Sequence, residues 1–211
     1  MLFYLNRTAL NHFPLINQEY LITDREPSNT DPCYELEPGK AEYRLYSYMS
    51  TLFNGTTILD IGTNLGRSAI ALSHNLSNQV ISYDIEDHIQ SKEYPLFRKP
   101  NIEFRLKNVL DDLTPAFLEK VKLVMIDICH TGPPERVIMD KLWECGFRGV
   151  VLLDDIWHPE QQYRDGMQKM WTELPWRKYD ITGVGHWSGT GLVVMNEVDE
   201  VIIDLTSDLM R

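Results

Sequence analysis

Cysteine is scarce in this sequence of 211 residues, with only Cys33, Cys129 and Cys145 present. An odd number of widely separated cysteines fits neither a disulfide framework nor a pair of zinc-binding motifs. We therefore expect reduced thiols and a cytoplasmic protein.

Positive charge is also in short supply. Lys and Arg number 20 against 31 Asp and Glu, which gives a formal net charge of -11. Proteins that bind a phosphate backbone need clustered basic side chains, and no such stripe runs along this chain. The composition therefore argues against nucleic acid as a substrate or partner.

Long apolar runs are missing as well. The run from Val121 to Ile128 contains Lys122 and Asp127, and it is far shorter than the roughly 20 residues of a membrane-spanning helix. The apolar start, residues 1–5, has no basic leader, so no signal peptide is predicted. We expect a soluble protein with no membrane segment, in which residues 1–5 are a candidate contact with a second copy in a homodimer.

The chain divides near residue 38. Residues 1–37 contain Pro14, Pro27 and Pro32 without a sustained period, which predicts an irregular arm or lid with one short helix at most. Residues 38–211 are expected to form one domain. It begins with apolar residues at helical spacing as far as Phe53, which predict a helix that ends at Asn54 and Gly55.

Short apolar segments then alternate with helical patterns, which is typical of βαβ units on a parallel sheet. Strands are predicted at Thr57–Ile61, Val80–Asp84, Ile102–Leu106, Leu123–Asp127 and Gly149–Asp154. Helices are predicted near Leu65–Leu76, His88–Phe97, Thr114–Lys120, Pro134–Cys145 and Pro159–Trp171. The segments Tyr179–Val184 and Gly191–Met195 are expected to close the sheet as an antiparallel pair. The fold class is therefore α/β.

A turn rich in small residues follows the first predicted strand, which ends at Asp60. Gly62, Asn64 and Gly66 allow a ligand to approach the backbone closely. Ser68 falls in the first helical turn, where free N–H groups favour a carboxylate. Taken alone, this turn also matches half of a dinucleotide-binding pattern, or a tight turn with no ligand.

The second predicted strand ends at Asp84, one βαβ unit after Asp60. An acid at this point accepts hydrogen bonds from ribose hydroxyls, which suits NAD and S-adenosylmethionine (SAM) equally. The turn after the first strand lacks the third glycine that supports a pyrophosphate. Because SAM carries no phosphate, the residues favour SAM.

The pattern Asp60-x-Gly62-x-Asn64-x-Gly66-x-Ser68, Asp84, the pair Asn108-Val109 after the third strand and the terminal hairpin together resemble class I SAM-dependent methyltransferases over about residues 38–196. The resemblance implies a Rossmann-like, doubly wound sheet of seven strands, mostly parallel with a C-terminal antiparallel hairpin and with helices on both faces.

The resemblance also implies the contacts of the cofactor. The methionine part of SAM would contact Asp60, Gly62, Thr63, Asn64, Gly66 and Ser68. Asp84 would hold the ribose, while Ile85, Asn108 and Val109 would border the adenine. For Asn108 the alternative is a turn residue that caps the next helix together with Asp111.

Three acids end the fourth and fifth predicted strands: Asp127, Asp154 and Asp155. Carboxylates at one edge repel one another unless a cation joins them, and Mg²⁺ prefers oxygen ligands. These positions are similar to the metal ligands of catechol-type and sugar-type O-methyltransferases, which implies Mg²⁺ or another divalent cation. Catechol-type enzymes usually have Asp-Asn at the fifth strand. The alternative is that Asp127 merely ends a strand and that only one acid of the pair faces the pocket.

Histidines supply the candidate bases. His130 stands where catechol-type enzymes carry a lysine, and a histidine accepts a proton near neutral pH. His130 is therefore the preferred base, with Asp127 beside it in the reacting site and at the edge of the bound SAM. The alternative for His130 is a place in the adenine pocket with Cys129. His158 is a ligand, a base or a cap before Pro159, and His186 lies in a glycine-rich loop that could close over a substrate.

The sequence thus predicts a SAM-dependent methyltransferase that methylates a hydroxyl of a small phenolic, sugar or natural-product acceptor with the help of a divalent metal. One alternative is another nucleotide-cofactor enzyme, such as an NAD-dependent oxidoreductase, against which the short glycine loop argues. The other is a catalytically silent SAM-fold module that binds a partner, although such a module has no need for three clustered acids.

Overall fold

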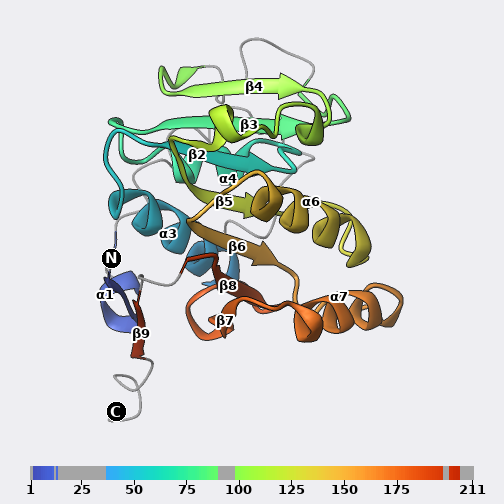
Figure 1. Cartoon of the computed structure of the whole chain (residues 1–211). Helices are drawn as coiled ribbons and strands as arrows, with labels where there is room; N and C mark the ends of the chain where they lie inside the picture. Colours follow the sequence, from blue (N-terminus) through green and yellow to red (C-terminus); the bar gives the residue numbers. More distant parts are fainter. Residues whose placement is uncertain (1, 12, 14–36, 90–97, 197–199, 205–211) are drawn as a thin grey trace.

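A seven-stranded sheet forms the centre of the computed structural model, which describes residues 2–11, 13, 37–89, 98–196 and 200–204 (Figure 1). Its strands are β2 (Thr57–Ile61), β3 (Gln79–Asp84), β4 (Ile102–Leu106), β5 (Val121–Ile126), β6 (Val150–Asp154), β7 (Arg177–Asp180) and β8 (Thr190–Val194). They lie in the order β4-β3-β2-β5-β6-β8-β7. Strands β2 to β6 are parallel, whereas β8 runs antiparallel to both β6 and β7. The predicted sheet and its closing hairpin are confirmed.

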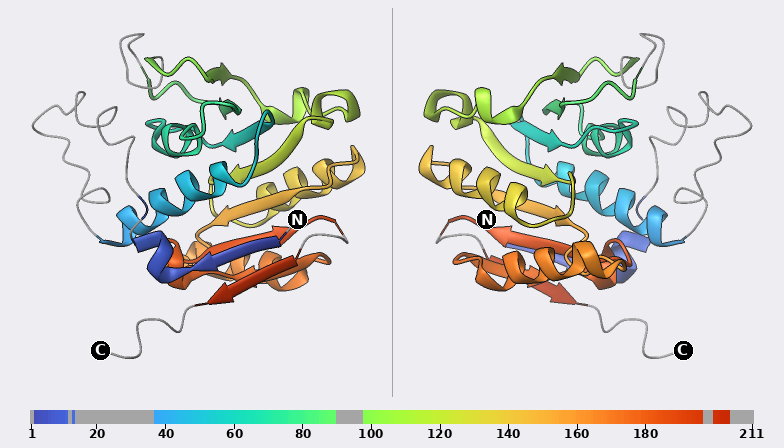
Figure 2. Two further views of the ribbon diagram at one scale, coloured as in Figure 1. Left: turned by 90° about the vertical axis from the view of Figure 1, so that its left-hand side faces the viewer. Right: turned by 90° about the vertical axis from the view of Figure 1, so that its right-hand side faces the viewer.

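Helices cover both faces of this sheet (Figure 2). The helices α3 (Glu37–Thr51) and α4 (Arg67–Leu72) pack on one face, and α6 (Pro133–Glu144) and α7 (Gln161–Glu173) pack on the other. Strand residues alternate between the two cores because successive side chains point to opposite faces. In β5, Leu123 and Met125 join the α3 side, while Val124 and Ile126 join the α6 side.

The shorter elements follow the predicted bounds only in part. Thr114 caps α5 (Pro115–Leu118) as expected, since its Oγ1 accepts a hydrogen bond from Phe117 N at 3.3 Å. The hairpin strand predicted to reach Val184 stops at Asp180, whose Oδ1 accepts hydrogen bonds from Thr182 N and Oγ1 and starts the 3-10 helix η5 (Thr182–Val184). Helix α4 ends at Leu72 rather than near Leu76. Of the helix predicted at 88–97, only residues 88 and 89 are described, and they are not helical.

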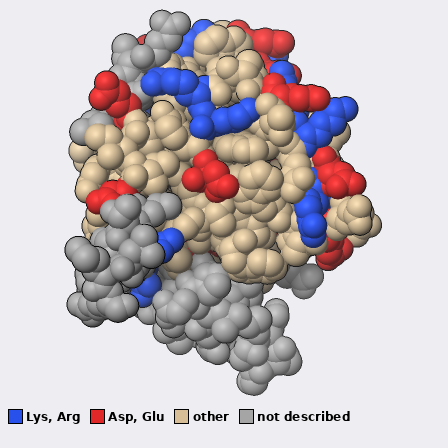
Figure 3. All heavy atoms as spheres, turned by 90° about the horizontal axis from the view of Figure 1, so that it is seen from below, with Lys and Arg blue, Asp and Glu red and all other residues tan. Residues whose placement is uncertain are grey.

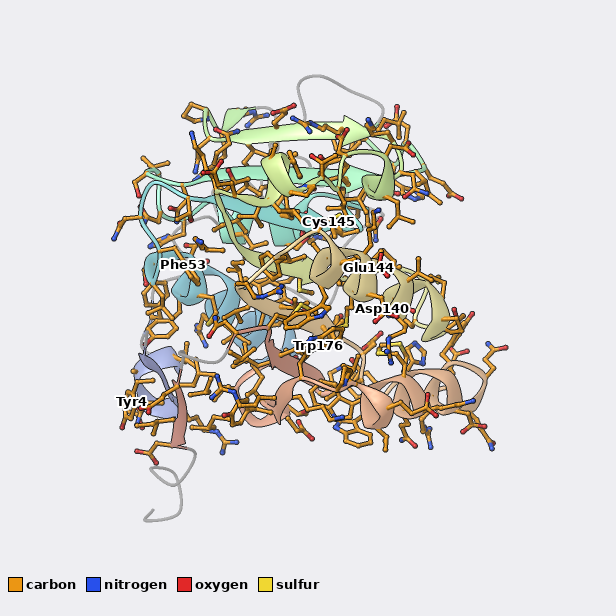
Figure 4. The ribbon with its side chains drawn as sticks, in the orientation of Figure 1. Tyr4, Phe53, Asp140, Glu144, Cys145 and Trp176 are labelled. Carbon is orange, nitrogen blue, oxygen red and sulfur yellow. The ribbon has the colours of Figure 1, made fainter. Side chains whose placement is uncertain are left out.

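The start of the chain is more regular than predicted. Strand β1 (Leu2–Asn6) pairs in parallel with β9 (Glu200–Asp204), and α1 (Arg7–Asn11) is a short helix in the described part of residues 1–37. Figure 4 labels Tyr4 on β1, and its hydroxyl donates to Asp204 Oδ2 at 3.1 Å. Leu5 is fully buried in the α3-side core of its own chain. The side chain of Leu5 is therefore not free to contact a second copy of the chain.

The charged side chains and the cysteines can be located in the structure. Lys and Arg are interspersed with Asp and Glu on the face seen from below in Figure 3. Within the described ranges, no helix combines the length and the apolar character that a bilayer crossing requires. Cys129 and Cys145 are free thiols, and Cys33 lies outside the described residues.

Candidate functional site

The turn after β2 needs glycine at its first position. Gly62 has φ +103°, and a Cβ atom there would lie 1.6 Å from the carbonyl oxygen of Asp127, the residue that follows β5. Gly66 has φ +74° and begins α4, and Asn64 adopts φ +43°. Asn64 N donates to Asp84 Oδ2 at 2.8 Å. The turn is therefore tied to the ends of both β5 and β3.

A cavity of about 640 Å³ opens at this carboxyl edge of the sheet. Its walls include most of the residues predicted to bind the cofactor: Gly62, Asn64, Asp84, Ile85, Asn108, Val109 and Asp127. The other predicted contacts do not line it: Asp60, Thr63, Gly66 and Ser68. The structure thus brings the nucleoside-side residues together around one space.

Asp60 lies in a buried polar network together with the turn. It is 1% exposed, and its Oδ2 accepts a hydrogen bond from Ser82 Oγ at 2.5 Å, while Thr63 Oγ1 contacts the same hydroxyl at 2.5 Å. Burial raises the pKa of Asp60 to about 6, although the hydroxyls of Ser82 and Ser68 oppose that rise. Asp60 Oδ1 has no hydrogen-bond partner among the described residues, which leaves it an acceptor for a further donor.

Asp84 keeps the capacity that a ribose requires. Its Oδ2 accepts from Asn64 N and its Oδ1 accepts from Glu86 N at 3.1 Å. A carboxylate offers about four acceptor positions, so each oxygen retains one for a hydroxyl. Asp84 also lines the cavity.

Asn108 and Ile85, two residues predicted to border the adenine, both line the cavity. Asn108 Oδ1 accepts from Leu110 N at 3.0 Å and caps the 3-10 helix η4 (Val109–Asp111). Because Asn108 also lines the cavity, the capping role and the cavity position coexist. Ile85 is 73% exposed beside the same space, and an exposed apolar side chain of this kind suits contact with an aromatic ring.

The acid pair at the end of β6 faces a histidine from the loop after η5. His186 Nδ1 lies 3.6 Å from Asp155 Oδ1 and 4.0 Å from Asp154 Oδ1. Asp154 and Asp155 are both buried, and the Oδ1 atom of each has no hydrogen-bond partner. Among the described residues, Asp154, Asp155 and His186 form the group that could hold a metal ion.

His130 lies between Asp127 and Asp155. Its Nε2 is 3.4 Å from Asp127 Oδ1, and its Nδ1 is 3.4 Å from Asp155 Oδ2. Asp127 is outside the group above, so its role as a metal ligand stays a prediction. Burial lowers the pKa of His130, and the charges of Asp155 and Glu135 only partly oppose this effect. The neutral ring that results near pH 7 can accept a proton.

A buried acid holds the backbone of His130 in an uncommon conformation. His130 has φ +54°, and its N–H donates to Glu135 Oε1 at 2.8 Å. Gly132 N donates to Glu135 Oε2, also at 2.8 Å. Glu135 is 1% exposed at the start of α6. Helix α6 therefore fixes the loop that carries the candidate base.

His158 caps a turn and faces the acid pair, while its roles as a ligand or a base stay predictions. Its Nδ1 accepts a hydrogen bond from Glu160 N at 3.1 Å, which caps the turn after β6. Its Nε2 lies 3.6 Å from Asp155 Oδ2. His158 is therefore fixed by its own turn and faces Asp155 with its second ring nitrogen.

Glu42 of α3 is a member of this cluster that the sequence reasoning missed. It is 6% exposed, and Tyr46 Oη donates to its Oε1 at 2.5 Å. Glu42 shares a helix face with buried Leu45, Tyr46 and Met49. A charged residue on that apolar face was the available signal, because buried charges need a partner.

The cluster carries more negative charge than its own residues neutralise. Burial, together with the charge of Glu42, raises the pKa of Asp127 and of Asp154 well above the ordinary value. Burial opposes ionisation of Asp155 too, but polar contacts with His186 and Ser188 lower its pKa below the usual range. A divalent cation replaces protons on such acids. The buried, unpartnered Oδ1 atoms of Asp154 and Asp155 fit that group.

Known structures share this architecture, although no protein-family model and no curated protein sequence matches the chain. A methyltransferase from Podospora anserina, solved with S-adenosylhomocysteine (SAH), has a TM-score of 0.64 and 12% identity over 87% of this chain and 89% of its own. The O-methyltransferase TomG of Streptomyces achromogenes, involved in tomaymycin synthesis and solved with SAM, has a TM-score of 0.58 and 15% identity. The match covers 89% of this chain and 99% of TomG. An O-methyltransferase from Bacillus cereus, solved with SAH, has a TM-score of 0.53 and 15% identity, over 88% of this chain and 99% of its own. The fold is that of class I SAM-dependent methyltransferases, as predicted.

Proposed function

We propose that this protein is a SAM-dependent O-methyltransferase that methylates a hydroxyl group of a small molecule with the assistance of a divalent cation. The observation that carries the proposal is the cavity at the carboxyl edge, which runs from Asp84 and the Gly62 turn to Asp127 and His130. A nucleoside acceptor and a candidate base therefore share one space. The likeness to SAM-bound and SAH-bound structures supports the same donor.

The donor half of the site would work by placement. Asp84 accepts hydrogen bonds from the ribose hydroxyls, Ile85 and Val109 flank the adenine, and Asp60 and the Gly62 turn border the methionine part. Because the turn is held to β3 and β5, it would hold the methionine part in a fixed place. Such positioning removes much of the entropic barrier of a bimolecular transfer.

The acceptor half would direct the hydroxyl and remove its proton. The hydroxyl oxygen attacks the methyl carbon, the carbon–sulfur bond breaks with its electron pair on sulfur, and SAH leaves. The hydroxyl proton passes to a ring nitrogen of His130, which is neutral near pH 7. Asp127 and Asp155 face the two ring nitrogens of His130, so they stabilise the charged ring that results.

Asp154 and Asp155 would hold the cation, with Asp127 as the further ligand that the sequence predicts. When bound, a divalent cation such as Mg²⁺ lowers the pKa of a hydroxyl that reaches it and orients that hydroxyl. His158 supports Asp155 by its contact at 3.6 Å. Asp154 would thus act on the cation alone, whereas Asp127 and Asp155 would also stabilise the charged ring of His130.

Titration calorimetry with SAM, SAH and NAD tests the donor site. We expect SAM and SAH to bind and NAD to leave the heat signal unchanged. Asp84→Asn should weaken SAH binding by roughly 10- to 100-fold, because it removes charge-assisted hydrogen bonds. Asp87→Asn is the matched control, since Asp87 is exposed and also accepts a backbone N–H, that of Ile89. Preferential NAD binding would instead indicate an oxidoreductase.

Methyl transfer to a panel of catechols, phenols and sugars tests the reaction. His130→Gln should lower the rate at saturating SAM by about 10²- to 10⁴-fold, because the base acts after binding, and should change SAH affinity far less. His74→Gln, outside the cavity, should keep the rate. If SAM binds but no acceptor is methylated, the silent-module alternative replaces the proposed reaction.

A further inference from the structure

We infer that His186 is a ligand of the proposed cation, together with Asp154 and Asp155, and that the site selects a first-row transition-metal ion over Mg²⁺. This inference rests on the proposed function for its cation and adds the third ligand and the class of metal. The sequence predicts Mg²⁺ or another divalent cation on Asp127, Asp154 and Asp155, with His158 as a candidate ligand, so His186 and the preference for a transition metal are new.

The atoms are close enough to share one ion. Two ligands that each lie about 2.1 Å from a metal are no more than about 4.2 Å apart. His186 Nδ1 is 3.6 Å from Asp155 Oδ1 and 4.0 Å from Asp154 Oδ1. The facing nitrogen and the two carboxylate oxygens therefore need only small side-chain rotations.

The two carboxylate oxygens point to a missing partner. The side chain of Asp154 is 8% exposed, and its buried Oδ1 has no hydrogen-bond partner. The buried Oδ1 of Asp155 has none either. Buried polar atoms are normally satisfied, and unsatisfied ones need an explanation such as an ion. Both oxygens face His186 Nδ1, which locates the ion between the three side chains.

The loop around His186 presents its ring to the acids. His186 N donates to Thr190 Oγ1 at 2.8 Å. A Cβ atom on Gly185 would lie 2.3 Å from the same Thr190 oxygen, so the loop packs directly on β8. Ser188 Oγ contacts His186 Nδ1. That contact occupies the nitrogen without a metal, and the cation would replace it.

Ligand chemistry sets the class of metal. Mg²⁺ prefers oxygen ligands and loses its waters reluctantly, whereas imidazole suits Zn²⁺, Fe²⁺ and Ni²⁺. Affinity for a mixed nitrogen and oxygen site rises from Mn²⁺ through Co²⁺ along the first row. His130 and His158 also face Asp155 within 3.6 Å. Three imidazole rings thus lie near Asp155, and that of His186 also faces Asp154.

Titration calorimetry of EDTA-treated protein with CoCl₂ and MgCl₂ tests the inference. We expect Co²⁺ to bind more tightly than Mg²⁺. His186→Asn, which offers an amide oxygen, should weaken Co²⁺ binding by roughly 10- to 100-fold and leave Mg²⁺ binding nearly unchanged. Asp154→Asn should weaken binding of both ions. His74→Asn is the matched control and should change neither.

Equal affinity of the wild-type protein for Co²⁺ and Mg²⁺, or unchanged Co²⁺ affinity in His186→Asn, would overturn the inference. Pulsed electron paramagnetic resonance of Mn²⁺-loaded wild-type protein keeps it falsifiable if the variant does not fold. A nitrogen coupling to the ion is expected, and its absence contradicts the ligand. SAH titration separates the two proposals, because a failure to bind SAH contradicts the proposed function alone.

Discussion

Replacing Gly62 with alanine tests the close approach of β2 and β5 on which the site depends. The new Cβ atom would lie 1.6 Å from Asp127 O, whereas real Cβ atoms essentially never come within 3.0 Å of such an atom. The backbone must therefore move by the difference, at least 1.4 Å. Such overlap costs about 1–3 kcal/mol, and alanine at positive φ adds about 1 kcal/mol.

The expected loss of unfolding free energy is thus about 2–4 kcal/mol for Gly62→Ala. In a chain of this size, about 1 kcal/mol lowers the Tm by about 2–4 °C, so thermal denaturation should show a fall of about 4–16 °C. Affinity for SAH should fall too, because the turn and Asp127 line one cavity.

Two other glycines separate backbone strain from overlap. Gly55 (φ +64°) and Gly146 (φ +83°) also have positive φ, but a Cβ atom there meets nothing within 4 Å. Each alanine variant should lose only about 1 kcal/mol, which lowers the Tm by about 2–4 °C. A Gly62→Ala variant as stable as these controls would refute the contact between the turn and Asp127.

Three further changes test the buried acids. The pKa of Asp60 rises from 3.8 to about 6 on folding, so the folded protein binds more protons than the unfolded chain in this window, and its stability falls as the pH rises from about 4 to 6. Denaturant unfolding at both ends of the window should show that Asp60→Asn removes up to about 3 kcal/mol of that fall, and an unchanged fall would contradict a raised pKa. In EDTA-treated protein, Glu42→Gln should raise the Tm by about 2–4 °C, because a buried charge near Asp127 and Asp154 is removed. A lower Tm would contradict the repulsion between Glu42 and these two acids. Glu135→Ala should lower the free energy of unfolding, measured with a chemical denaturant, by about 3–6 kcal/mol, because two charge-assisted hydrogen bonds are lost. The control Glu144→Ala, at the exposed end of the same helix (Figure 4), should change it by no more than about 0.5 kcal/mol. Equal losses of stability in the two variants would contradict the role of Glu135 in fixing the loop that carries His130.

The five parallel strands could be predicted because each is a short segment between turn residues that is either largely apolar or, in β4, alternates apolar and charged residues, and local pattern decides such segments. Strand β1 could not be predicted in this way, because it forms by pairing with β9, which lies almost 200 residues away along the chain. Tertiary context decides strands of this kind. The end of β7 has a different cause, because there a local contact between Asp180 and Thr182 stops the strand.

The donor side of the site was more predictable than the acceptor side for a related reason. Gly62, Asn64 and Asp84 lie at fixed steps from strand ends, so chain order places them. Glu42 and His186 reach the acids from α3 and from the loop after η5, far along the chain from β6. Only packing brings them there, and no spacing in the sequence encodes it.

Backbone strain marks the same edge of the sheet. Within the described residues, Asn64, His130 and Asp155 are the non-glycine residues with positive φ, and they follow β2, β5 and β6 respectively. Such conformations cost free energy and persist where surrounding contacts enforce them. Asp84, Glu135 and the η5–β8 loop supply those contacts. The strained positions coincide with the donor turn, the candidate base and the acid pair.

Strand β5 joins these parts mechanically. The carbonyl oxygen of Asp127 packs against Gly62, its carboxylate faces His130, and His130 in turn faces Asp155. A shift of the donor turn therefore moves the group beside the base. For this reason Gly62→Ala should reduce methyl transfer at saturating SAM as well as SAH affinity. If saturating SAM restores the full rate, the two halves of the site are independent and this coupling is wrong.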